Sequence, residues 1–85
     1  MNKMKEKILE AYERLKNAAK GAEAAYKANP ADKIGCVTLI GKNITFNDSD
    51  AFIQAVNLAD VFEVYPKTDG TIQMDFTFYN RNQED

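Results

Sequence analysis

The chain has 85 residues, of which 45% are hydrophobic and 28% are charged, and its formal net charge at pH 7 is −2. These proportions are typical of a soluble globular domain and exclude a disordered or fibrous chain. There is no histidine, which removes the commonest general base and metal ligand, and the single cysteine excludes an internal disulfide. We expect one domain over residues 1–85, with residues 81–85 as a frayed tail.

The N-terminal residues are charged and lead into an amphipathic segment, which is typical of neither a signal peptide nor a membrane span. We therefore expect a cytoplasmic protein that does not enter a membrane. Residues 1–42 hold nine Lys/Arg and five Asp/Glu, whereas residues 43–85 hold two and eight. This asymmetry predicts a basic first half and an acidic second half.

The first predicted element is a long helix, indicated by apolar residues spaced alternately four and three apart. This seam consists of Met4, Ile8, Ala11, Leu15, Ala18, Ala22 and Ala25. Asn2 can cap the start of the helix, and Pro30 disfavours helical geometry in Asn29, so the helix is predicted to end there. The alanines in the seam would let another backbone approach closely.

A helix of about 26 residues would be roughly 39 Å long, which is longer than a domain of this size needs. We therefore expect its second half to dock on another chain, and we expect a homodimer. The predicted interaction residues are the small seam residues and a second apolar set beside them: Ala11, Ala18, Ala22, Ala25, Tyr12 and Tyr26.

A β-hairpin is predicted next. Residues 34–40 are apolar on both faces, which is typical of a central strand covered on both sides, and Cys36 within it is expected to be a core residue. Gly41-Lys42 suits a two-residue turn, and residues 43–46 would form the returning strand.

A short helix follows. Residues 47–50 offer capping oxygens and first-turn negative charge, which is typical of a helix start. Capping is preferred to calcium binding, because the downstream residues lack the glycine and glutamate of a calcium loop. The helix should end near residues 57–59.

A second hairpin completes the chain. Residues 61–65 and 71–80 are predicted strands, joined by a turn over residues 66–70. The last strand alternates apolar and polar residues, which indicates one buried and one wet face. The predicted fold class is therefore α+β in the order α-β-β-α-β-β, with a four-stranded, mainly antiparallel sheet and helices on one face.

The wet face of the last hairpin is a second predicted interaction surface. Its residues are Glu63, Thr71, Gln73, Asp75, Thr77 and Tyr79. The carboxylates on this hairpin and its turn are expected to keep ordinary pKa values, because they lie on edges, turns or wet faces.

The motifs of common enzymes and cofactor sites are missing from the sequence. Residues 35–42 have the wrong spacing and context for a phosphate-binding loop, and Cys36 has no cationic neighbour in the sequence to activate its thiol. We predict no enzyme activity, no catalytic or metal-binding residue and no cofactor.

The sequence thus favours a non-enzymatic protein–protein interaction module that self-associates and occludes a partner protein. Small acidic α+β chains of this kind are also typical of phage inhibitors of bacterial defence enzymes, by analogy of size and composition only. One alternative is a small-molecule-binding dimer with a pocket lined by Tyr12, Tyr26, Phe46 and Phe62. Another is nucleic-acid association through the basic helix, which is disfavoured because acidic residues interrupt its lysines.

Overall fold

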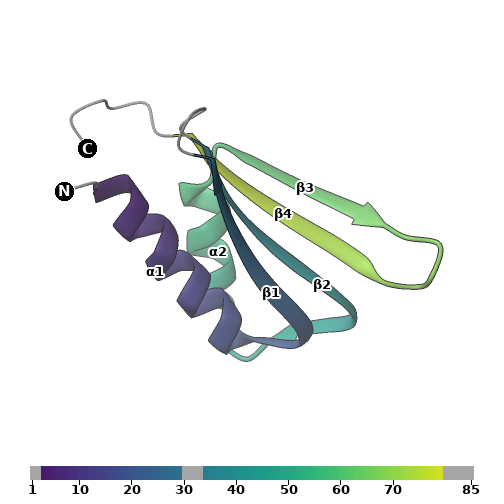
Figure 1. Ribbon diagram of the computed structural model, residues 1–85. Helices are drawn as coiled ribbons and strands as arrows, with labels where there is room; N and C mark the ends of the chain where they lie inside the picture. The colour runs from purple at the N-terminus through teal and green to yellow at the C-terminus, as the bar shows by residue number, and fades with distance from the viewer. Residues whose placement is uncertain (1–2, 30–33, 80–85) are drawn as a thin grey trace.

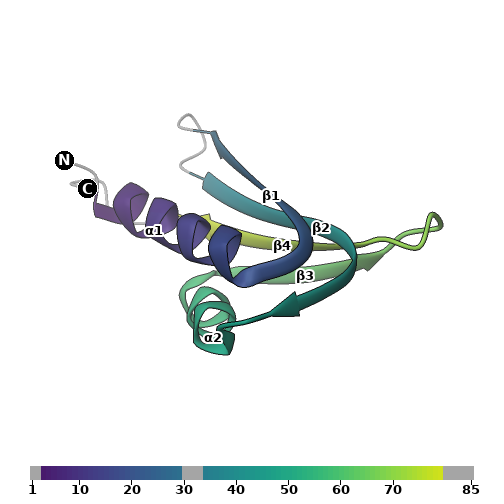
Figure 2. The same cartoon turned by 90° about the horizontal axis from the view of Figure 1, so that it is seen from below.

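The computed structural model describes residues 3–29 and 34–79. Its elements are α1 (Lys3–Ala18), β1 (Ala19–Asn29), β2 (Ile34–Phe46), α2 (Ser49–Leu58), β3 (Val61–Pro66) and β4 (Ile72–Tyr79). The strands form one antiparallel sheet in the order β1-β2-β4-β3, and both helices lie against the same face (Figures 1 and 2). The predicted α+β class and element order are confirmed. The predicted Asn2 cap and the frayed tail lie outside the described residues. The predicted helix end at Asn29 is wrong, because Asn29 is the last residue of β1.

The first helix is shorter than predicted. It ends at Ala18, and residues 19–29 form strand β1, which pairs antiparallel with β2. The alanine-rich segment fits a strand because its side chains also alternate, with Ala22, Ala24 and Tyr26 packed against the core. Pairing with β2 thus overrides the high intrinsic helix propensity of alanine.

The predicted turn at Gly41-Lys42 is also wrong, because β2 runs through both residues as one strand. Its partner β1 is irregular between Lys20 and Ala22, where Gly21 has a φ of 77°. A Cβ atom on Gly41 would lie 1.9 Å from the carbonyl oxygen of Gly21. Position 41 therefore requires glycine because two backbones approach closely there, and not because the chain turns.

The hydrophobic core lies between the helices and one face of the sheet. Its largest fully buried side chains come from α1, β2 and β4: Leu15, Val37, Leu39, Phe76 and Phe78. The seam residues of α1 are buried as well: Ile8, Ala11, Leu15 and Ala18. The first half of the predicted seam is therefore internal packing of the monomer.

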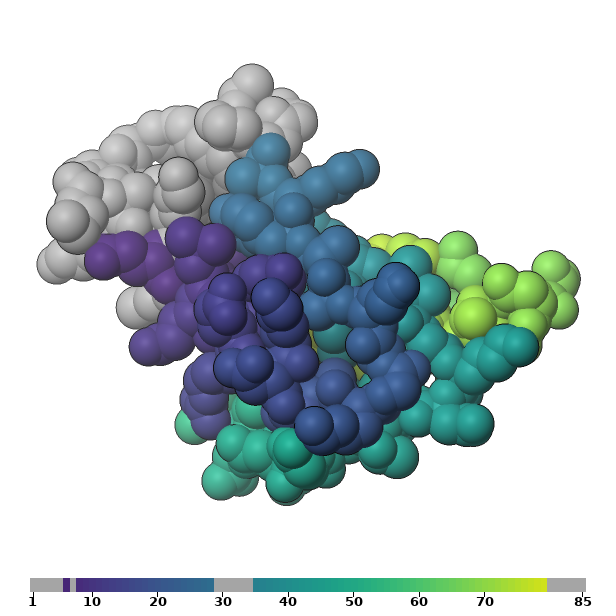
Figure 3. Space-filling view, turned by 60° about the horizontal axis from the view of Figure 1, so that its bottom comes forward, coloured from purple at the N-terminus to yellow at the C-terminus, as the bar shows by residue number. Residues whose placement is uncertain are grey.

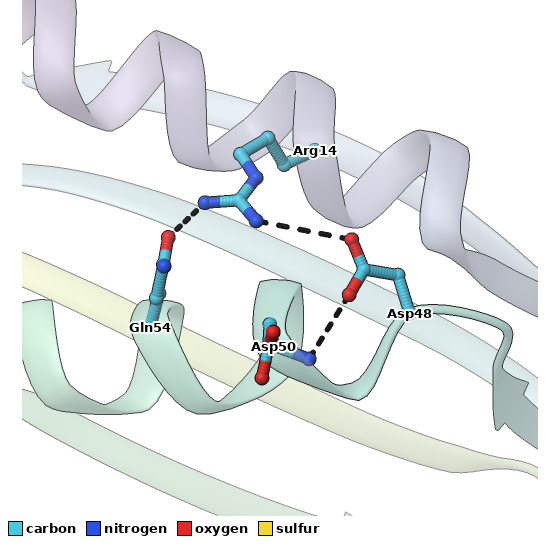
Figure 4. A network of polar contacts seen from close by, with 4 residues as sticks. All are labelled: Arg14, Asp48, Asp50 and Gln54. Carbon is cyan, nitrogen blue, oxygen red and sulfur yellow. Dashed lines mark hydrogen bonds and ion pairs between the residues drawn. The ribbon is translucent and has the colours of Figure 1, made fainter.

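Arg14 of α1 contacts the first turns of α2 (Figure 4). Asp48, one of the predicted helix-start residues 47–50, is the N-cap of α2, and its Oδ1 accepts a hydrogen bond from the backbone N–H of Asp50 at 3.1 Å. Its Oδ2 lies 3.8 Å from Nη2 of Arg14, whose Nη1 donates to the side-chain oxygen of Gln54. One arginine thus links the two helices that cover the sheet.

Candidate functional site

The two helices leave the other face of the sheet uncovered. In β2, Val37 and Leu39 point toward the helices and are fully buried, whereas Cys36 is half-buried and Ile40 is 39% exposed. The predictions that residues 34–40 are covered on both sides and that Cys36 is a core residue are therefore wrong. The reason is that both helices pack on one face, so no described element forms a layer over the other (Figure 2).

We call this uncovered surface the open face. By strand register and alternation, it consists of Glu23, Ala25 and Lys27 of β1, Cys36, Thr38 and Ile40 of β2, Gln73, Asp75, Thr77 and Tyr79 of β4, and Val61, Glu63 and Tyr65 of β3. None of these residues is buried. The open face is therefore accessible across all four strands.

The predicted wet strand face forms part of the open face. Five of its six residues lie there together: Glu63, Gln73, Asp75, Thr77 and Tyr79. The sixth, Thr71, precedes β4, and its Oγ1 and backbone N–H donate to a carboxylate oxygen of Asp69 at 2.6 and 2.9 Å. These hydrogen bonds lower the pKa of Asp69, the side-chain bond most, which corrects the prediction of an ordinary pKa for this turn residue.

The predicted helix-seam residues do not form one surface. Three of them belong to β1 and not to a helix: Ala22, Ala25 and Tyr26. Ala11 and Ala18 are buried in the core beneath α1, and Tyr12 packs against Tyr26 with ring centroids 6.0 Å apart. The predicted docking seam on a long helix is therefore wrong, because the helix ends before its second half begins.

The aromatic residues predicted to line a pocket fall into two groups. Tyr12 and Tyr26 contact each other, whereas Phe46 and Phe62 both pack on Phe52, with centroid separations of 4.8 and 5.8 Å. No ring contact among the described residues joins the two groups. All of these rings pack against the hydrophobic core.

Asp75 is the centre of a hydrogen-bond network on the open face. Oγ1 of Thr38 donates to its Oδ1 at 3.1 Å, and Nε2 of Gln73 donates to Oδ1 and Oδ2 at 3.0 and 3.2 Å. Glu63 lies directly opposite Asp75 on the neighbouring strand. Neither carboxylate forms an ion pair with a side chain that the structure describes. The ion pair among these side chains joins Arg14 of α1 to Asp48 at the start of α2. Two like charges thus occupy a directly opposed position, which destabilises a sheet.

Tyr65 extends this acidic part of the open face. A hydrogen bond to the Glu63 carboxylate raises the pKa of the Tyr65 hydroxyl, and desolvation and the negative charges of Glu63 and Asp75 raise it further. The Tyr65 hydroxyl is therefore a protonated donor at neutral pH. The Tyr65 side chain is 41% exposed, so a partner could still contact its ring.

Sequence reasoning missed several residues of the open face, among them Glu23 and Lys27 of β1, Thr38 of β2 and Tyr65 of β3. Glu23 and Lys27 were assigned to a helix, and Thr38 to a strand covered on both sides. Thr38 reaches Asp75 across 37 positions of sequence, so their contact depends on the pairing of β2 with β4. No local pattern in the sequence indicates it.

The open face offers groups suited to recognition. It presents carboxylates, an amide, hydroxyls and tyrosine rings. The thiol of Cys36 makes three long contacts: 3.7 Å to Oγ1 of Thr38, 3.9 Å to Oγ1 of Thr77 and 3.9 Å to the backbone carbonyl oxygen of Val37. Within residues 3–29 and 34–79, no group of three or more acidic, cysteine or histidine side chains could hold a metal ion. In the same part of the chain, no helix has the length and apolar character needed to cross a membrane.

The fold and the open face together define a small α+β protein with a two-layer architecture and one exposed sheet surface. Comparisons with protein-family models, with curated proteins and with solved structures find no match to this chain. Its function must therefore be inferred from the site itself.

Proposed function

We propose that this protein is a non-enzymatic protein-interaction module whose open face binds and occludes a partner protein that presents lysine or arginine side chains. The observation that supports this most is the directly opposed pair of carboxylates, Glu63 and Asp75. A cation from a partner would remove their mutual repulsion. Natural proteins often retain such local conflicts where a surface has a function.

Exposed apolar groups beside the carboxylates support the same proposal. Ile40, Tyr65 and Tyr79 on the open face are 39%, 41% and 37% exposed. Tyrosine is enriched in protein interfaces because its ring buries apolar area while its hydroxyl makes hydrogen bonds. A surface with apolar rings around charged acceptors suits a basic protein surface better than it suits a nucleic-acid backbone, which is itself negative.

The orientation of the Asp75 side chain also favours binding. Asp75 is held by hydrogen bonds from two neighbouring side chains, so its carboxylate is oriented before a partner arrives. Preorganisation of this kind reduces the entropy lost on binding. Occlusion of a partner requires no chemistry beyond such binding.

The test is NMR titration of the labelled protein with an arginine-rich peptide and with a glutamate-rich peptide of equal length. We expect the arginine-rich peptide to shift amide resonances of β3 and β4 around Glu63 and Asp75, and Glu63→Lys to weaken binding by about tenfold or more. Glu10→Lys makes the same charge change on the exposed side of α1 and should leave binding within about twofold. Equal binding of both peptides, or shifts confined to α1, would overturn the proposal.

A further inference from the structure

β1 is an edge strand, and its outer side pairs with no strand in the described chain. The sheet order leaves β1 and β3 at its two edges. An edge strand presents unpaired backbone N–H and C=O groups, to which a strand of another chain can add. In Figure 3, β1 lies at the surface beside α1, and no other described segment covers it in this view.

The charges of β1 are complementary to those of a second, antiparallel β1. Glu23 and Lys27 are exposed on the open face, two residues to either side of Ala25, in the part of β1 that follows the irregularity. A two-fold axis through Ala25 would place Glu23 of each copy opposite Lys27 of the other, and opposed residues in antiparallel strands share a face. Two oppositely charged pairs would thus form at once.

We propose that two copies of this chain pair through β1, with Ala25 on the two-fold axis, and join their four-stranded sheets into one continuous sheet. The charges select this register. If the axis moves by one residue, Glu23 lies opposite Ala25 or Asn29 of the other copy, and no oppositely charged pair forms. If it moves by two residues, either the two Glu23 residues or the two Lys27 residues lie opposite each other. Directly opposed like charges destabilise a strand pair, and opposite charges stabilise it.

The other face of β1 accommodates the same register. Ala22, Ala24 and Tyr26 point toward the helix layer and are half-buried. The proposed pairing sets Tyr26 opposite Ala24 of the other copy and Ala22 opposite Ala28. Small alanine side chains leave room for the tyrosine ring, and the seven residues from Ala22 to Ala28 would overlap over roughly 23 Å.

The second edge strand is a poorer candidate for self-pairing. The sequence of β3 has Glu63 as its single charged residue, and β3 ends at Pro66, which has no backbone N–H to donate. In antiparallel self-pairing of β3, Glu63 would face itself or an uncharged residue. β3 therefore has no self-complementary charges, whereas β1 does.

The test uses analytical ultracentrifugation of the full chain with charge-reversed variants. We expect the natural chain to dimerise, and Glu23→Lys and Lys27→Glu each to raise the dimer dissociation constant by about tenfold or more, because each change creates two repulsive pairs. The double variant Glu23→Lys/Lys27→Glu should restore dimerisation, since the swapped charges are again complementary. An equimolar mixture of the two single variants should form a heterodimer for the same reason.

Matched controls separate this interface from general charge effects. Glu10→Lys on α1 and Lys42→Glu on β2 change exposed residues outside the proposed strand pair and should leave the dissociation constant within about twofold. Circular dichroism of every variant would confirm that each still folds. A natural chain that remains monomeric at millimolar concentration would overturn the proposal. A dissociation constant that changes in neither single variant would also overturn it. So would a double variant that dimerises more weakly than either single variant. None of these readouts requires the proposed basic partner, so failure here leaves the proposed function to be tested separately.

Discussion

Glu63 of β3 and Asp75 of β4 lie directly opposite each other on the open face, and among the described side chains neither has an ion-pair partner. Hydrogen bonds from Thr38 and Gln73 orient Asp75 without neutralising it. Like charges directly opposed across a sheet destabilise it, and a bound cation would offset this cost. Stability and binding should respond in opposite directions when this pair is changed.

Glu63→Gln should stabilise the free protein. Glutamine removes one of the two like charges and keeps an oxygen that can accept a hydrogen bond from Tyr65. We expect the free energy of unfolding, measured by urea denaturation, to rise by about 0.2–1 kcal/mol. Glu13→Gln on the exposed side of α1 is the control, and its effect should stay within about 0.5 kcal/mol. A destabilised Glu63→Gln protein would show that the repulsion is already relieved.

Gly41→Ala should strongly destabilise the fold. The new methyl group would lie 1.9 Å from the Gly21 carbonyl oxygen and 2.9 Å from the Ala22 Cα, both of which are backbone atoms that cannot rotate away. We expect a loss of about 3 kcal/mol or more in the free energy of unfolding. Gly70→Ala is the matched control. A Cβ atom on Gly70 would meet no neighbouring atom within 4 Å, so only the positive φ of 90° would strain the alanine, at a cost of about 1 kcal/mol. Equal losses in the two variants would argue against the close approach of β1 and β2.

Asp48→Ala should weaken both the start of α2 and its link to α1. The substitution removes the oxygen that caps the Asp50 N–H and the partner of the Arg14 guanidinium. The cap is worth about 1 kcal/mol, and the exposed ion pair adds at most about 1 kcal/mol. Thermal and urea unfolding would measure the loss. The neighbouring Ser49→Ala should change stability by less than about 0.5 kcal/mol, and an equal loss there would contradict the assigned cap.

Thr71→Val should raise the pKa of Asp69 toward its ordinary value. The Thr71 hydroxyl bond is the largest cause of the lowered pKa, and the backbone N–H bond, which valine retains, is the next. Because the pKa is lower in the folded state, Asp69 contributes stability above its unfolded pKa, and that contribution is lost as the pH falls through the folded pKa. Carbon-detected NMR titration of the carboxyl group would measure the change. Thr68→Val in the same turn is the control, and an unchanged pKa in Thr71→Val would refute the assignment.

Local signals in the sequence correctly predicted the elements whose residue patterns fit only one kind of secondary structure. The alternation from Ile72 to Phe78 defined β4 and its two faces, and Asp48 marked the start of α2. The elements α2, β3 and β4 followed from such signals. They succeed because capping and alternation depend on residues a few positions apart.

The segment from Ala19 to Asn29 shows where local signals fail. Its alanines fit a heptad seam and a two-residue alternation equally well, and alanine favours helix in isolation. Pairing with β2 decides between them, and that pairing joins residues as far apart as Ala19 and Phe46. The role of Gly41 was predicted wrongly for a related reason. A glycine that is needed because another backbone lies close to it cannot be distinguished, from the local sequence, from a glycine that is needed for a turn.

The sequence by itself thus determined the α+β class, the elements from α2 to β4 and part of the open face. Only the tertiary structure decided that β1 is a strand, that Glu63 opposes Asp75 and that Glu23 and Lys27 share an exposed edge. The physical reason is that helix caps and strand faces depend on local geometry. The partners across a sheet depend on the register between strands, which forms only when distant segments pair.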